Sequence, residues 1–247
     1  MRVVLIGRGR LATNLYAALK RAGHEVASIN SRTLDELPVE ADIFIVSVKD
    51  AALKEVIGKA AKGRENQLFV HTAGSMPLNI FEGHTRRYGV LYPMQTFSKE
   101  RLVDFMEIPV FIEGSDPTIK LLADSISRRV YALSTEERKY LHLAAVFACN
   151  FANHCYTLSA RILERHGLPF DVMLPLIDET ARKVHELHPL DAQTGPAVRY
   201  DENVINMQSQ LLDGAMRELY ERLSQSIHEN AIRHDQLRLK EDTGYRV

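Results

Sequence analysis

The feature that most constrains the fold is the stretch VVLIGRGRLATNL, residues 3–15. Four apolar residues lead into GRGRLA, residues 7–12, and helix-forming residues follow. Such a glycine pair between a strand and a helix indicates a dinucleotide-binding turn, whereas without a ligand it makes only a tight corner. We expect Gly7 to form the turn, Gly9 to let a pyrophosphate approach the backbone, and Ala12 to allow close packing of helix on strand.

Strand-like and helix-like segments alternate through the first half of the chain. The apolar run at residues 43–48 is typical of a parallel sheet that is covered on both faces. This order predicts an α/β, Rossmann-like doubly wound parallel sheet. The expected strands cover residues 2–6, 25–30, 43–48, 67–71, 89–92, 108–112 and 129–132, and the expected helices cover residues 11–22, 50–61 and a segment that starts at Ser115-Asp116-Pro117.

The second half of the chain has a helical pattern only. Ser134 can cap a helix, and Glu137 stands at the capping-box position three residues later. We expect helices over residues 136–165, 170–188 and 203–232. The sequence therefore predicts an α/β domain at residues 1–134 and a smaller all-helical domain at residues 135–233. Residues 234–247 are polar, and we expect a frayed tail or an arm onto a partner subunit.

Composition excludes some classes of function. The net charge of -1 implies no general attraction to nucleic acid or to a membrane surface. No apolar stretch approaches the roughly 20 residues that span a bilayer. Cys149 and Cys155 are the only cysteines and form no CxxC motif, which favours free thiols in a reducing compartment. These patterns predict a cytoplasmic protein without nucleic-acid or membrane partners.

The end of the second predicted strand indicates which dinucleotide would bind. NAD sites carry an Asp or Glu there, which accepts hydrogen bonds from the ribose 2′-hydroxyl. This strand ends in INSRT, residues 29–33, and the first acids, Asp35 and Glu36, come later. Ser31, Arg32 and Thr33 instead suit a 2′-phosphate, because hydroxyl and guanidinium groups bind phosphate oxygens. The pattern therefore favours NADP(H), with a solvated surface arginine as the alternative.

Several stretches of the sequence resemble known protein families. The N-terminal half resembles the Rossmann domains of pyrroline-5-carboxylate reductase, F420-dependent NADP oxidoreductase and the 6-phosphogluconate dehydrogenase superfamily, through GRGRLA, NSRT, SVKDAAL and VHTAGS. Most of residues 2–212 resembles a family of NADP oxidoreductases that joins such a domain to a helical domain of unknown function, DUF2520. The matching stretches are HTAGSMPL, YPMQTFS, YLHLAAVFACNF, LPLIDET and TGPAVRYD. They identify the family and leave the substrate open.

The resemblance implies cofactor roles for two further loops. It places Ser47, Val48 and Lys49 over the ribose and phosphates, and Thr72, Ala73 and Gly74 near the nicotinamide ribose. The start of the first helix, at Arg10 and Leu11, would present N–H groups to the phosphates. The sequence departs from the related pattern at Arg8 and Arg10, where small or apolar residues are usual. Arg10 can add a phosphate contact, and Arg8 can simply be solvated.

Polar residues for catalysis are expected in a cleft between the two domains. His142 is the predicted proton donor, because histidine titrates near neutral pH. At 100° per residue, Asn150 lies about 80° and Asn153 about 20° from His142 around the helix. The related families use a lysine on this helix, but the motif around Lys139 does not match. The alternatives are a structural histidine and ordinary hydrogen bonds between helices.

Two further stretches supply candidate residues. Ser75, with His71, follows the fourth predicted strand and can face the cleft. In TGPAVRYD, Arg199 can grip a carboxylate and Asp201 can orient it, or Asp201 can be a helix cap beside an exposed arginine. The HELH stretch at residues 185–188 lacks HExxH spacing and predicts no metal site. His71 and Ser75 lack a third partner for a nucleophilic triad.

Together these patterns predict an NADP(H)-dependent oxidoreductase. It would transfer hydride to or from a small carbonyl or imine compound bound between the Rossmann-like and helical domains. The alternative is a non-catalytic NADP(H)-binding sensor or scaffold, because fold does not determine function. The helical half has more apolar surface than a short bundle needs, which favours a homodimer through that domain. The residues that carry this surface are Leu143, Val146, Phe147, Phe151, Leu211, Leu212, Met216, Leu219 and Leu223.

Overall fold

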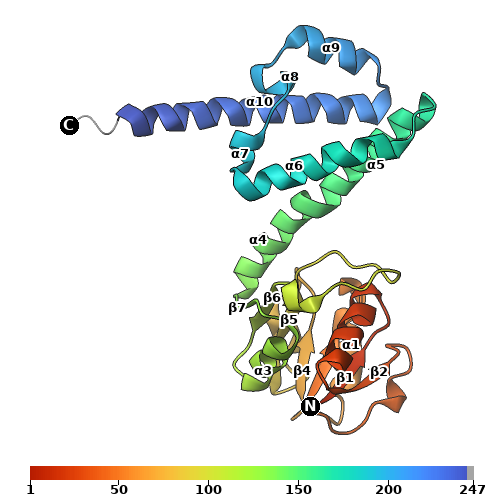
Figure 1. Ribbon diagram of the computed structural model, residues 1–247. Helices are drawn as coiled ribbons and strands as arrows, with labels where there is room; N and C mark the ends of the chain where they lie inside the picture. The colour runs from red at the N-terminus through yellow and green to blue at the C-terminus, as the bar shows by residue number, and fades with distance from the viewer. Residues whose placement is uncertain (244–247) are drawn as a thin grey trace. The chain divides into compact units, whose positions relative to one another are not determined.

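The computed structural model describes residues 1–243, with side chains through residue 237. The chain forms two compact units, Met1–Ala152 and Asn153–Val247 (Figure 1). The boundary between the units falls later than the change of sequence pattern at residue 134. The reason is local, because the first turns of the following helix, which carry Arg138 and His142, contact the sheet domain.

The first unit is built on a sheet of seven strands in the order β2-β1-β3-β4-β5-β6-β7. The first five strands run parallel, β6 is antiparallel to β5, and β7 is parallel to β6. The Rossmann-like fold class is confirmed, but the sheet is parallel only over its first five strands. The strands are β1 (Arg2–Ile6), β2 (Glu25–Ile29), β3 (Ile43–Val46), β4 (Leu68–His71), β5 (Arg87–Pro93), β6 (Val110–Glu113) and β7 (Val130–Ala132).

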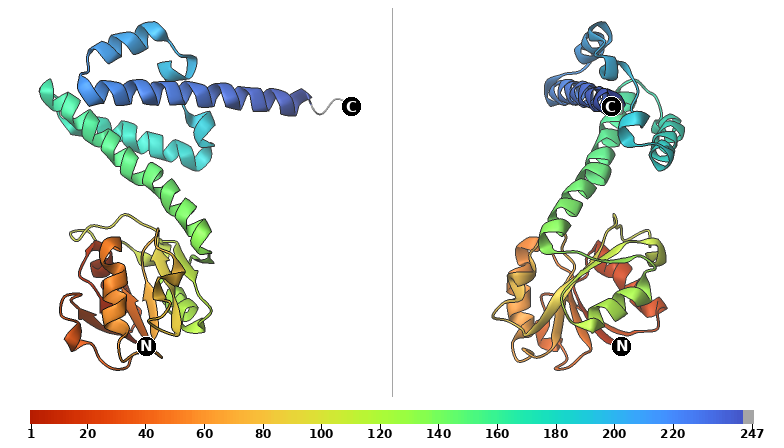
Figure 2. Two further views of the ribbon diagram at one scale, coloured as in Figure 1. Left: turned by 180° about the vertical axis from the view of Figure 1, so that it is seen from behind. Right: turned by 90° about the vertical axis from the view of Figure 1, so that its left-hand side faces the viewer.

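Helices cover both faces of this sheet. α1 (Arg10–Arg21) and α3 (Pro117–Ile126) pack on one face, and α2 (Asp50–Ala61) packs on the other (Figure 2). All residues of β3 and β4 are buried, as strands covered on both sides require. Each face therefore has its own apolar cluster, with Leu15 in one and Ile57 in the other.

The predicted helix starts are present. The Asp116 side chain accepts a hydrogen bond from the Thr118 N–H, and Pro117 occupies the first turn of α3. Ser134 and Glu137 form the predicted capping box at the start of α4 (Thr135–Ala145). The chain then makes a π-helical segment, Val146–Phe151, before α5 (Ala152–Arg165).

The second unit is entirely helical over its described residues. The predicted helix at 203–232 is two helices, because α9 ends at Gln210 and α10 starts at Gly214, which has a φ of 48°. α10 continues through the predicted tail as far as Thr243, so this part is helical and not frayed, and an arm onto a partner subunit stays a prediction. Residues 244–247 lie outside the described part. The helices after α5 are α6 (Leu174–Glu186), α7 (Pro189–Ala192), α8 (Pro196–Arg199), α9 (Glu202–Gln210) and α10 (Gly214–Thr243).

Short 3-10 turns complete the description: residues Leu34–Glu36, Leu78–Phe81, Phe105–Glu107 and Phe170–Met173. Among the described helices, none combines the length and the apolar character needed to cross a membrane.

Candidate functional site

The site lies where the parallel strands end. The reversal of strand order around β1 and β3 opens a crevice at this edge, which is where doubly wound sheets bind ligands. Three backbone hydrogen bonds extend the ladders by one residue: Gly7 donates to Ile29 at 2.9 Å, Ser47 to Ile6 at 2.8 Å and Thr72 to Val46 at 3.3 Å. The loops after β1, β3 and β4 therefore leave the sheet side by side.

The two glycines of the first loop have different environments. Gly7 has a φ of 130°, and a Cβ there would lie 2.1 Å from the Ser47 carbonyl oxygen, so only glycine fits. Gly9 has ordinary backbone angles, and a Cβ there would meet no atom within 4 Å. Gly9 also begins α1 without a side-chain cap, which leaves the first-turn N–H groups open. The open space and the free donors fit a pyrophosphate at Gly9.

A groove of about 1730 Å³ runs along this edge, within the first unit. We call it the edge groove. It collects most of the cofactor residues that the sequence predicts, and it also includes His142. The predicted residues that line it are Gly7, Gly9, Arg10, Leu11, Ser31, Arg32, Ser47, Val48, Lys49, Thr72, Gly74 and His142.

Two predicted cofactor residues lie outside this lining. Ala12 is 1% exposed and belongs to the apolar cluster under α1, in agreement with its expected packing role. The Thr33 hydroxyl donates to the Asn30 carbonyl at 3.4 Å, and the Thr33 N–H donates to the same oxygen. Thr33 therefore closes the turn that presents Ser31 and Arg32.

Asp35 also lines the edge groove, although the sequence places it too late for a ribose contact. The 3-10 turn Leu34–Glu36 explains the difference, because it brings this carboxylate back to the rim. Leu34, Ala52 and Val56 give the same end of the groove an apolar wall.

His71, the last residue of β4, supports the loop that follows this strand. This side chain is fully buried and stacks on Phe81, so it does not face a cleft as the sequence suggested. Its Nδ1 accepts a hydrogen bond from the Ala73 N–H at 3.2 Å, which shapes the turn before Gly74. Burial lowers the pKa of His71 to about 4, assisted by the Arg138 charge and opposed by the Pro77 carbonyl and by Asp50. His71 is therefore neutral and structural.

The Ser75 hydroxyl contacts the start of α2. It donates to the Asp50 carboxylate at 2.5 Å, which ties the β4 loop to the start of α2. Ser75 does not line the edge groove, whereas its neighbours Ala73 and Gly74 do. A catalytic role for Ser75 stays a prediction without a supporting contact.

His142 lies beside Gly74 and Tyr92. The Tyr92 hydroxyl oxygen is 3.0 Å from His142 Nδ1, and both side chains line the edge groove. A Cβ on Gly74 would lie 2.5 Å from the same Nδ1. Sequence reasoning missed Tyr92; its position at the end of β5, in LYP, is the signal that could have found it.

A buried ion pair fixes the start of α4, and the sequence analysis also missed it. Arg138 is 1% exposed, pairs with Glu113 and donates to the Met76 carbonyl. The Thr135 hydroxyl and N–H donate to the same Glu113 carboxylate at 2.9 Å. Arg138 and His142 are four residues apart and so share one face of the helix. The ion pair therefore orients the face that carries His142.

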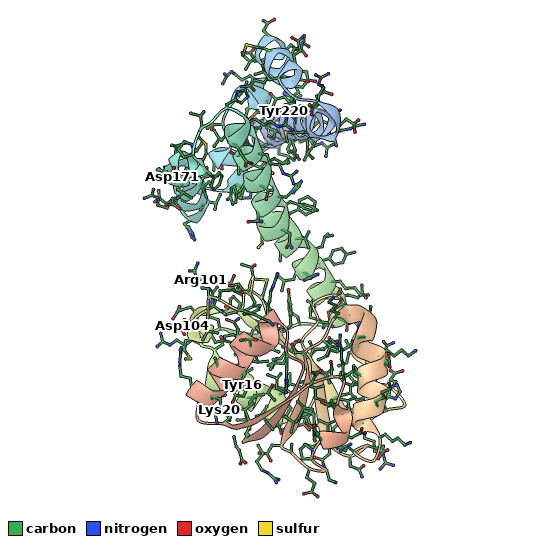
Figure 3. All side chains as sticks on the ribbon, turned by 90° about the vertical axis from the view of Figure 1, so that its right-hand side faces the viewer. Tyr16, Lys20, Arg101, Asp104, Asp171 and Tyr220 are labelled. Atoms are coloured by element: carbon green, nitrogen blue, oxygen red, sulfur yellow. The ribbon has the colours of Figure 1, made fainter. Side chains whose placement is uncertain are left out.

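The loop that follows β5 is tied to α1. Asn14, 2% exposed, donates to the Ser98 carbonyl at 2.7 Å and accepts from the Val103 N–H at 3.1 Å. Figure 3 labels Arg101 and Asp104 in this segment. Lys99 on the same loop lines the groove.

Asn150 is not brought to the groove. It lies in the π-helical segment, is exposed and is absent from the groove lining. A π turn contains an additional residue, so the angles of 80° and 20° that α-helical spacing predicted for Asn150 and Asn153 do not apply. The roles of both residues stay predictions.

Arg199 belongs to the second unit. It ends α8 and is exposed, and Tyr200 follows in a left-handed conformation with a φ of 51°. Asp201 caps α9 by accepting from the Val204 N–H at 3.4 Å, which is the alternative that the sequence left open. In HELH, His188 Nδ1 accepts from the Leu190 N–H and so caps α7. The described residues contain no cluster of three metal-ligating side chains.

Comparisons with known proteins agree with this architecture. The family model for a domain of unknown function, DUF2520, matches residues 108–227. No curated protein sequence matches the chain. A solved structure from Bacteroides fragilis, named as a candidate NADP oxidoreductase, is similar at 53% identity and a TM-score of 0.87, over 92% of this chain and 98% of that chain.

More distant solved structures share the fold. A Thermotoga maritima protein is similar at 24% identity and a TM-score of 0.69, over 94% of this chain and 99% of that chain. An imine reductase from Myxococcus stipitatus, solved with NADP⁺, is similar at 14% identity and a TM-score of 0.62, over 96% of this chain and 95% of that chain. From the identity and coverage of the Bacteroides match, together with the DUF2520 match, the chain belongs to the family of Rossmann-like proteins that carry a C-terminal DUF2520 domain.

Proposed function

We propose that this protein is an NADP(H)-dependent oxidoreductase that transfers hydride to or from a small carbonyl or imine compound. The carrying observation is the edge groove, in which the glycine turn, Arg32 and His142 line one continuous space. The Bacteroides fragilis relative, named as a candidate NADP oxidoreductase, supports the same assignment.

The charge of the groove supports a cofactor with several phosphates. Eight lysine and arginine side chains line it against three carboxylates. This excess of positive charge complements the pyrophosphate and 2′-phosphate of NADP(H). One of the eight, Arg64, is used internally, because it donates to the Leu37 and Pro38 carbonyls and holds the segment after the 3-10 turn. The others include Arg10, Arg32 and Lys49.

Each part of the groove has a chemical task. The Gly9 turn and the start of α1 bind the pyrophosphate, and Arg32 binds the 2′-phosphate beside Ser31. NADPH, when bound, supplies the hydride. His142 lies at the Gly74 end of the groove, where it can supply the proton that a reduced carbonyl or imine requires.

Cofactor preference is the first test, and Arg32→Ala is its variant. We expect the full-length protein to bind NADPH more tightly than NADH in a calorimetric titration. Arg32→Ala should weaken NADPH binding about 10- to 100-fold and leave NADH binding nearly unchanged, because a charged hydrogen bond is lost. Arg21→Ala, at an arginine of α1 outside the groove lining, is the matched control. Equal binding of both cofactors by the wild-type protein would contradict the assignment.

Asp35 allows a sharper form of this test. A carboxylate on the groove rim repels a 2′-phosphate and can accept a hydrogen bond from a 2′-hydroxyl. We expect Asp35→Ala to strengthen NADPH binding slightly and to weaken NADH binding, the opposite selectivity to Arg32→Ala. A panel of carbonyl and imine acids, followed by loss of NADPH absorbance, then tests turnover. Binding without any turnover across the panel would favour the sensor or scaffold alternative.

The second unit supports a homodimer through the helical region. Of its described side chains, only Ile205, Ser209 and Ser224 are buried. Large apolar side chains of its helices are exposed, among them Leu176 and Leu211, at 63% and 79%. A helical unit without a buried core gains its stability by covering such surface, and a second copy of the chain offers a matching one.

We further propose a cytoplasmic location. Cys149 and Cys155 are both free thiols, as a reducing compartment favours.

A further inference from the structure

Tyr92 and His142 form a pair at the Gly74 end of the edge groove. Tyr92 stands at the end of β5, and His142 lies two turns into α4. Their rings meet edge to face, with centroids 6.0 Å apart and an interplanar angle of 72°. The Tyr92 hydroxyl oxygen is 3.0 Å from His142 Nδ1, within hydrogen-bond distance.

The pair is held on two sides. A Cβ on Gly74 would lie 2.5 Å from His142 Nδ1 and 3.0 Å from Tyr92 Cζ, so both rings close over this glycine. The buried ion pair of Arg138 with Glu113 fixes α4 one turn before His142. Packing of both rings on Gly74 and the ion pair at the start of α4 therefore fix the distance between the Tyr92 hydroxyl and the His142 imidazole.

The hydroxyl proton of Tyr92 has two possible directions. Within the described residues, His142 Nδ1 is the only hydrogen-bond partner of this hydroxyl. When His142 is neutral, the phenol can donate to a bare Nδ1, and the imidazole proton is then on Nε2. When His142 is protonated, Nδ1–H donates to the phenol oxygen, and the phenol proton turns away from the ring, toward the groove.

The phenol is a poor acid by itself. Tyr92 is 8% exposed, and burial raises its pKa, with the Arg138 charge acting in the opposite direction. A lone phenolate at this position would be costly. Transfer from Tyr92 therefore requires that its oxygen is reprotonated as its own proton departs, and His142 Nδ1–H is placed to do this.

We propose that Tyr92 is the catalytic residue that delivers the proton to the reduced substrate, and that His142 resupplies Tyr92 through Nδ1. The inference rests on the proposed reductase function. As the substrate nitrogen or oxygen takes the hydroxyl proton, the O–H bond of Tyr92 breaks and a new one forms with the Nδ1 proton. Protonated His142 becomes neutral and keeps its proton on Nε2. The electron pair of the reduction comes from the hydride of NADPH.

The proposal predicts the tautomer of His142. After transfer, neutral His142 carries its proton on Nε2 and accepts from Tyr92 through Nδ1. If His142 instead donated directly from Nε2, neutral His142 would carry its proton on Nδ1. Nitrogen NMR of histidine-labelled, full-length protein separates the two, and loss of signals in His142→Gln assigns the resonances. The measurement is made with and without NADP⁺.

We expect the Nε2–H tautomer in the wild-type protein, and a changed Nδ1 resonance in Tyr92→Phe. The matched control is Tyr88→Phe on the same strand, because Tyr88 stacks on Phe81 and does not line the edge groove. This control should leave the His142 resonances unchanged. A neutral Nδ1–H tautomer, or an Nδ1 resonance that Tyr92→Phe does not alter, would overturn the relay.

In kinetics, we expect the losses in the rate of hydride transfer from the two single substitutions not to add in the double variant. With an accepted substrate, Tyr92→Phe should slow hydride transfer about 100-fold, while NADPH binding stays within about twofold of the wild type. The double variant with His142→Gln should be no slower than the slower single variant, because one relay is removed. Losses of rate that multiply in the double variant would contradict the relay. Failure to bind NADPH would instead reject the proposed function, and the tautomer result would still decide the pairing.

Discussion

His71 shows how position in the fold decides the chemistry of a single residue. In the sequence it is a polar residue at the end of a strand, like the residues that line active sites. In the structure it is fully buried, stacks on Phe81 and accepts one hydrogen bond from the Ala73 N–H. Its pKa is lowered from 6.5 to about 4, chiefly because burial disfavours the charged form. Protonation of His71 therefore opposes folding.

The lowered pKa of His71 predicts acid sensitivity of the first unit. The unfolded chain takes up the proton as pH falls below 6.5, and the folded chain resists it until about pH 4. Stability is thus intact above about pH 6.5 and is lost as pH falls toward 4. We expect a loss of about 2 kcal/mol between about pH 7 and about pH 5 from this group, from the linkage relation.

Urea unfolding of wild-type protein and His71→Asn at the two pH values measures this loss. The asparagine oxygen can accept from Ala73 but does not titrate, so the variant should show a smaller pH dependence. His154→Gln replaces an exposed histidine and serves as the control. Equal pH dependence in the wild type and His71→Asn would show that His71 is not buried in its neutral form.

At the scale of elements, the turn between β1 and α1 holds two glycines with different environments within three residues. Gly7 meets the Ser47 carbonyl of the neighbouring strand, whereas Gly9 faces open space. The motif predicted both roles, because a strand followed by a helix at this spacing leaves one glycine in the turn and one beneath the ligand. The π turn after α4 shows the opposite case, since no sequence periodicity indicated it and the α-helical angles used for Asn150 do not apply across it.

Alanine substitutions at the two glycines should therefore differ in effect. Gly7→Ala adds a clash to an unfavourable φ, and we expect a loss of about 2–4 kcal/mol in the free energy of unfolding. Gly9→Ala should change stability by less than about 1 kcal/mol and weaken NADPH binding at least about 10-fold, because its Cβ occupies the pyrophosphate space. Thermal unfolding and NADPH titration measure the two effects. A Gly9→Ala variant that binds NADPH with full affinity would show that the pyrophosphate does not bind at this turn.

At the scale of the whole molecule, the two units differ in what stabilises them. The first has apolar clusters on both faces of its sheet. The second has only three buried residues among those described, although its helices carry many apolar side chains. A chain of this kind is expected to bury that surface in a second copy.

A charged residue on the exposed apolar surface should disrupt this assembly. We expect the wild-type protein to be a dimer by light scattering, and Leu211→Asp to shift it toward monomer and to lower its melting temperature. Leu121→Asp, on α3 of the first unit, is the control, because Leu121 is also exposed, at 59%. A wild-type monomer at micromolar concentration would contradict the dimer.

The local pattern of the sequence was enough to predict the strands and helices of the Rossmann-like sheet, the glycine turn, the loop that places Ser31 and Arg32 in the edge groove, and the caps at Asp116 and Ser134. The strands, helices, turn and caps depend on neighbours within a few residues, and local backbone preferences decide them. Only the tertiary structure decided three other features. These are the contact of Tyr92 with His142, the ion pair of Arg138 with Glu113, and the place of Asp35 on the groove rim. The first two join residues from separate strands and helices, and the third depends on a short turn. A single sequence does not record which distant side chains meet when the chain folds.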